Sequence, residues 1–120
     1  MAKILVHVTH GPEAPTRAAL AFLVAKSAID EGHTVSLFLA GDAVQLLRDA
    51  VLDNLAGLGT GELRSHFDAI VSDRGRFYLS GMSSKGRGVT DEDLRDKPAE
   101  FTMPNVLVQL SLDHDRMFTY

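Results

Sequence analysis

Short apolar runs alternate along this chain with longer segments of helical periodicity. The first run, Ile4–Val8, is nearly continuous, and further strand-like runs follow at 34–39, 76–79 and 116–119. A run that is apolar at almost every position is typical of a strand covered on both faces, as in a parallel sheet. The alternation therefore predicts an α/β fold, a three-layer α/β/α sandwich with a mainly parallel sheet of four or five strands.

The segments between these runs read as helices. Arg17 to Glu31 is rich in good helix formers and is followed by Gly32, a typical C-terminal helix stop. Further helices are predicted over 44–52, over 62–72 and over 106–110. Apolar side chains cover most of the circumference of the first helix, so a second surface should cover it. A neighbouring copy of the chain is the simplest cover, and we expect a homo-oligomer.

Size and composition narrow the class of protein further. A chain of 120 residues is the usual size of one domain, so residues 1–120 are expected to form a single domain. The formal net charge of -4 gives no basic excess, which argues against a nucleic-acid partner. No run approaches the ~20 apolar residues of a membrane span or forms a signal-peptide core. We expect no membrane partner and a cytoplasmic location.

The chain has no cysteine, which removes several kinds of chemistry together. Disulfides, thiolate nucleophiles, persulfide carriers and thiolate zinc sites all require that side chain. Hydroxyl, imidazole and carboxylate chemistry remain. The sequence calls for no cofactor.

The histidines suggest no metal site. His114 lies between Asp113 and Asp115, but three consecutive residues cannot converge on one ion without further ligands. His7 falls within the first strand and is expected to be a hydrogen-bonded core residue. His33 should lie in the turn before the second strand.

A glycine-rich stretch, Ser80–Val89, directly follows the third apolar run and holds three glycines, three serines and two cations. If the first and third strands were adjacent, with the second strand outside the first, residues 9–12 and 80–84 would line one crevice at a topological switch point. Charge and backbone N–H groups there would suit a small anion such as phosphate, sulfate or a carboxylate. The candidate ligand-binding residues are His10, Gly11, Ser80, Gly81, Ser83, Ser84, Lys85 and Arg87.

Other roles for these residues stay open. The hydroxyls of Ser80 and Ser83 could cap a helix that starts near Ser84 instead of holding a ligand. Ser80 and His10 could form a nucleophile and base pair, although no carboxylate is placed to orient the imidazole and no G-x-S-x-G elbow is present. The Walker spacing is absent, so nucleotide hydrolysis is not expected.

Several segments spread over nearly the whole chain carry a resemblance to a known family. They are Thr9–Pro12, Arg17–Phe22, Ala25–Ala28, Gly32–Val35, Gly41–Val44, Tyr78–Val89 and Asp115–Phe118. In these segments the chain resembles the DsrE/DsrF-like, or YchN-like, family. The resemblance implies a small α/β subunit that assembles into trimers or hexamers. Some members pass persulfide sulfur in tRNA modification or sulfur oxidation.

The sequence departs from the family pattern at one position that bears on function. Sulfur-carrying members place a cysteine at the end of the third strand, and the matching residue here is Ser80. A serine hydroxyl cannot hold a persulfide, because it lacks the soft, readily ionised nucleophile of a thiol. The resemblance therefore implies an oligomeric accessory or anion-binding protein, related to sulfur-relay proteins but without thiol chemistry.

Alternatives to that function come from other classes. One is a sulfur-relay component whose thiol is supplied by a partner protein. Another is a weak enzyme that uses Ser80 and His10. A third is a purely structural subunit of a ring, in which the crevice is filled by the protein's own side chains.

Overall fold

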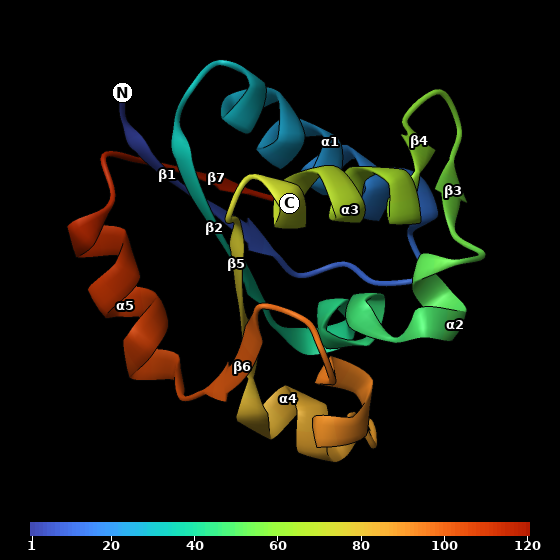
Figure 1. Ribbon diagram of the computed structural model, residues 1–120. Coiled ribbons are helices and arrows are strands. Elements are labelled where there is room, and N and C mark those ends of the chain that lie inside the picture. The colour runs from blue at the N-terminus through green and yellow to red at the C-terminus, as the bar shows by residue number, and fades with distance from the viewer.

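The structure, a computed structural model, describes residues 1–120 and is built around a five-stranded sheet with helices on both faces (Figure 1). All neighbouring strands of this sheet pair in parallel, which confirms the predicted fold class. From one edge to the other the strands are β6 (Ala99–Thr102), β5 (Arg76–Ser80), β2 (Thr34–Leu39), β1 (Lys3–Val8) and β7 (Arg116–Thr119). A separate hairpin pairs two strands of two residues each, β3 (Ala56–Gly57) and β4 (Gly61–Glu62).

The order of the strands differs from the expected one. β2 lies between β1 and β5, so the first and third long strands are not neighbours. The chain adds β2, β5 and β6 in turn on one side of β1 and then returns to the other side of β1 with β7. The direction of winding therefore reverses between β1 and β7, and the topological switch point lies there.

Two helices, α1 (Pro15–Asp30) and α3 (Leu63–Ser72), pack together over one face of the sheet and enclose the main core. Phe77 of β5 is central, with its ring centroid 5.8 Å from that of Phe22 and 5.2 Å from that of Phe67. Apolar residues of β1, β2 and β5 complete the same cluster. α1 ends where predicted, and Gly32 just beyond it has a φ of 90°, a conformation that glycine adopts without strain.

The opposite face carries a single helix, α5 (Pro104–Asp113), and is much less covered (Figure 1). None of the residues of α5 is buried, and Leu112 keeps 83% of its surface exposed. His7 points toward this face, because side chains alternate along β1 and its neighbours Val6 and Val8 lie in the main core. Its ring packs edge-on against Phe38 and has no hydrogen-bond partner, so it is not the hydrogen-bonded core histidine that we expected. Burial lowers the pKa of His7.

Four shorter helices lie near the carboxyl ends of the strands. The predicted helix over 44–52 is divided into a 3-10 helix, Gly41–Leu47, and α2 (Asp49–Leu52). Arg48 separates them in an extended conformation, with its guanidinium donating to the backbone oxygen of Arg87 over 2.9 Å. α4 (Gly81–Gly86) and the 3-10 helix Asp91–Leu94 follow β5. No helix combines the length and the hydropathy needed to cross a membrane.

Candidate functional site

The corners that follow β1, β2 and β5 meet at the carboxyl edge of the sheet, with the β2 corner in the middle. The backbone N–H of Gly41 donates to Ser83 Oγ over 2.9 Å, which joins the β2 corner to α4. On the other side, a Cβ atom added to Gly11 would lie only 2.1 Å from the backbone oxygen of Asp42. Residues 9–12 and 80–88 thus lie at the same edge, but each contacts residues 41–42.

Ser80 is the last residue of β5 and caps α4. Its Oγ accepts a hydrogen bond from the backbone N–H of Ser83 over 3.2 Å, and the residue is only 7% exposed. Capping was one of the two roles that the sequence left open for this hydroxyl. Ser83 Oγ is also occupied, since it accepts the N–H of Gly41. Each hydroxyl oxygen therefore has a structural role as an acceptor, while its O–H remains a possible donor.

Arg87 is held by the β2 corner. Its Nε donates to Asp42 Oδ1 over 2.9 Å and its Nη1 donates to the backbone oxygen of Ser83 over 3.2 Å. The carboxylate of Asp42 balances the guanidinium charge, so an incoming anion would have to compete with it. Asp42 was not among the predicted site residues. The sequence did offer a signal for Asp42, because it directly follows Gly41 at the end of a predicted strand.

Ser84, Gly81 and Lys85 line an open groove of about 370 Å³ next to β6, together with Thr90 and Phe101. Ser84 Oγ is buried and has no hydrogen-bond partner. Lys85 is exposed and makes no ion pair with any carboxylate. Of the predicted serines, Ser84 alone has a hydroxyl with no partner, and of Lys85 and Arg87 only Lys85 has no carboxylate partner.

His10 is turned toward α1 and contacts Arg17. The Nη1 atom of Arg17 lies 3.2 Å from His10 Nε2, and His10 Nδ1 lies 3.4 Å from Thr9 Oγ1. A guanidinium can only donate, so Nε2 accepts and Nδ1 carries the proton in this arrangement. Adjacent strands lie about 4.8 Å apart, which puts β1 and β5 roughly 10 Å apart across β2. His10 and Ser80 therefore make no nucleophile and base pair in this structure.

The remaining histidines belong to local structure. His33 precedes β2, as predicted, and its Nδ1 accepts the backbone N–H of Ala2 over 3.0 Å. His66 Nε2 lies 2.7 Å from the backbone oxygen of Thr60. The structure contains no group of three or more histidine and acidic side chains that could hold a metal ion.

Comparison with known proteins places this fold and sequence in one family. The model of the DsrE/DsrF-like family matches residues 2–120. The crystal structure of the ychN protein from E. coli superposes with a TM-score of 0.82 at 19% identity, covering 100% of both chains. The structure of a conserved protein of unknown function, BT1422 from Bacteroides thetaiotaomicron, gives a TM-score of 0.70 at 10% identity, covering 99% of this chain and 95% of that one. No curated protein matches the sequence. The family match spans nearly every residue, and the chain therefore belongs to the DsrE/DsrF-like family as a member without cysteine.

Proposed function

We propose that this protein is an oligomeric accessory subunit that binds a small anion and performs no thiol chemistry. The observation that carries the proposal is the state of Ser80. By resemblance it stands where sulfur-carrying members have their cysteine, and its hydroxyl is buried as the cap of α4. An alcohol in that position offers no persulfide carrier, and the chain has no cysteine elsewhere to replace it. A role in binding is what remains for this edge of the sheet.

The groove at α4 supplies the groups that an anion would use. The ammonium group of Lys85 is unpaired, and Ser84, whose hydroxyl is buried without a partner, lines the same groove. A buried polar group without a partner is rare and calls for an explanation such as an ion or water. Arg87 is already paired with Asp42, so the proposal assigns the charge contact to Lys85.

A titration with inorganic sulfate, followed by amide NMR shifts, tests the binding proposal. We expect saturable shifts confined to residues 81–90. Lys85→Gln should lower the affinity about tenfold or more, because a charge-assisted hydrogen bond contributes roughly 1.5–3 kcal/mol. The matched control is Arg76→Gln, which removes an exposed cation at the opposite end of β5. Equal affinities for the two variants would contradict the assignment.

The enzyme alternative, a Ser80 nucleophile with His10 as base, finds no support in the geometry. The two residues follow strands that β2 separates, and each side chain has other partners. A serine-directed fluorophosphonate should therefore leave Ser80 unlabelled, as intact-protein mass spectrometry would report. Stoichiometric labelling at Ser80 would support the enzyme alternative instead.

Self-association is the second part of the proposal, and α5 supports it better than α1 does. α3 packs against one flank of α1, which weakens the sequence argument that α1 needs a partner subunit. α5 buries no residue, although Val108 and Leu112 lie one helical turn apart and are both exposed. A helix with such a face is normally covered in a stable protein. We propose that a second copy of this chain covers this face of α5.

A further inference from the structure

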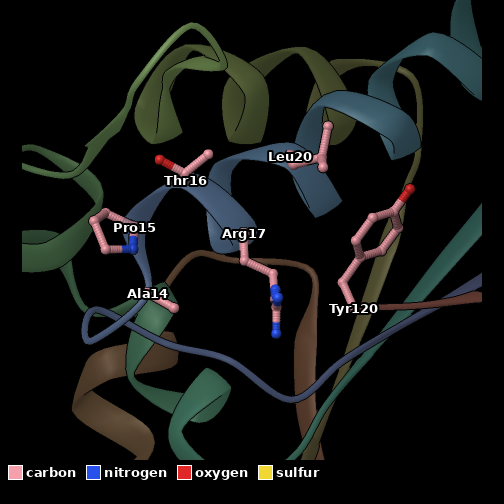
Figure 2. A pocket seen from close by; sticks show the side chains of 6 residues that line it. All are labelled: Ala14, Pro15, Thr16, Arg17, Leu20 and Tyr120. Atoms are coloured by element: carbon pink, nitrogen blue, oxygen red, sulfur yellow. The ribbon is translucent and has the colours of Figure 1, made fainter.

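A second and larger groove, of about 770 Å³, lies between the first turn of α1 and the end of β7 (Figure 2). It shares no residue with the groove at Lys85. It opens beside the carboxyl ends of β1 and β7, where the winding of the sheet reverses. Parallel α/β sheets bind their ligands at such switch points, since the loops diverge there and leave a crevice.

Arg17 brings an uncompensated positive charge to this groove. It makes no ion pair with any carboxylate, and one of its N–H groups is directed to His10 Nε2 at 3.2 Å. His10 is held in turn by Thr9, whose hydroxyl donates to the backbone oxygen of Tyr120 over 2.9 Å. This chain of hydrogen bonds fixes one side of the guanidinium and leaves its other N–H groups available to a ligand.

The rest of the lining is mainly apolar. Figure 2 shows Leu20 and Arg17 extending from α1, with the ring of Tyr120 facing them from the end of β7. Pro15 lies farther along the same wall. An inorganic ion would contact the guanidinium of Arg17 and leave these apolar surfaces exposed to water. A ligand with a flat apolar ring would cover them, because aromatic rings pack favourably against tyrosine and leucine.

We propose that this groove binds a small aromatic anion, a single ring that bears a carboxylate or a phosphate ester. The anionic group contacts the guanidinium of Arg17, and the ring lies between Tyr120 and Leu20. His10 is a positioning residue, which acts by holding Arg17 toward the groove. This site is independent of the proposed anion groove at Lys85.

The test is an amide NMR titration of the full chain with phenyl phosphate and, separately, with benzoate. We expect saturable shifts at residues 14–20 and 120 for at least one of the two, which also tells the phosphate ester from the carboxylate. Inorganic phosphate has the charge without the ring, and benzyl alcohol has the ring without the charge. Each should bind at least about tenfold more weakly than the better aromatic anion.

Variants separate the contributions of charge, ring and positioning. Arg17→Gln should weaken binding about tenfold or more, and Tyr120→Leu, which keeps an apolar side chain, should weaken it severalfold. His10→Leu should weaken binding, whereas His10→Gln should restore it, because the glutamine amide oxygen can accept the same N–H of Arg17. Lys85→Gln should leave binding here unchanged, so failure at either groove can be told from failure at the other.

Three results would overturn the proposal. One is equal affinity for inorganic phosphate and phenyl phosphate. Another is the absence of saturable shifts at residues 14–20 with both aromatic anions. The third is undiminished binding in Arg17→Gln, provided that the amide spectrum shows the variant to be folded.

Discussion

By resemblance, Ser80 stands where sulfur-carrying members of the family have a cysteine, a side chain that differs from serine by one atom. The backbone around Ser80 already has the arrangement that activates a thiol, since the side chain accepts the N–H of Ser83 at the start of α4. A thiolate at a helix N-terminus is stabilised by such a donor, which lowers the pKa of the cysteine. A cysteine at this position would have one such donor.

A cysteine placed at position 80 should therefore be reactive. We expect the thiol of Ser80→Cys to be alkylated with a pH midpoint below about 8.5, the ordinary pKa of cysteine. The control is Ser72→Cys, an exposed position at the end of α3, whose midpoint should stay near that value. Alkylation rates measured against pH give both midpoints. A midpoint for Ser80→Cys at or above that of Ser72→Cys would show that burial outweighs the helix terminus.

We expect His7 to make the free energy of unfolding depend on pH. Burial lowers the pKa of His7 below its ordinary value of 6.5, because the charged ring loses water on the α5 face of the sheet. Below about pH 6.5 the unfolded chain binds a proton more readily than the folded chain does, so the folded state loses stability as the pH falls toward the folded pKa. Above about pH 6.5 the effect is absent, since the histidine is neutral in both states.

Two measurements check this sign. The ring protons of His7 should titrate by NMR with a midpoint below 6.5. Urea unfolding should show that His7→Leu loses less stability than the wild type between about pH 7 and about pH 5. A His7 ring that titrates at or above 6.5 would contradict the claim that burial lowers its pKa.

At the level of elements, the corners of β1 and β2 are close enough to exclude a single methyl group. Gly11→Ala would place its Cβ 2.1 Å from the backbone oxygen of Asp42. The backbone must shift to relieve this contact, and we expect a loss of about 1–3 kcal/mol in the free energy of unfolding. Gly86→Ala is the matched control, because nothing lies within 4 Å of its added Cβ. Chemical denaturation of both variants should show a loss only for Gly11→Ala.

Local patterns predicted most of the elements and little of their arrangement. β1, β2, β5, β7 and α1 were predicted because runs of apolar residues and helix stops lie within a few residues of one another. β6 was missed, since its four residues, Ala99–Thr102, form a partly exposed edge strand with a weak pattern. The order of the strands was wrong, because periodicity identifies a strand without identifying its neighbours.

The candidate site shows the same division between local and distant information. The capping role of Ser80 could be predicted from the neighbouring residues, and the structure confirms that Ser80 caps α4. The pairing of Arg87 with Asp42 joins residues 45 positions apart and depends on where β2 lies in the sheet. The place of Tyr120 beside Thr9 and Arg17 follows from the return of β7 to the edge next to β1.

At the scale of the whole molecule, the two faces of the sheet are unequally covered. α1 and α3 bury one face, whereas the other has only α5, which exposes Val108 and Leu112. β7 adds Met117 to the exposed apolar surface at this edge. Exposed apolar surface of this extent favours association in a soluble domain. The family resemblance implies trimers or hexamers, and the α5 face is where we place the contact.

Light scattering on the purified chain tests this contact. We expect a mass of three or six times the 13.0 kDa chain for the wild type. Leu112→Glu should reduce it to the mass of one chain or of a smaller assembly, because a buried unpaired carboxylate is costly at an interface. Leu58→Glu is the matched control, since Leu58 is 90% exposed but lies in the β3–β4 hairpin beside α1. A monomeric wild type, or the same mass for both variants, would remove the α5 face as the site of assembly.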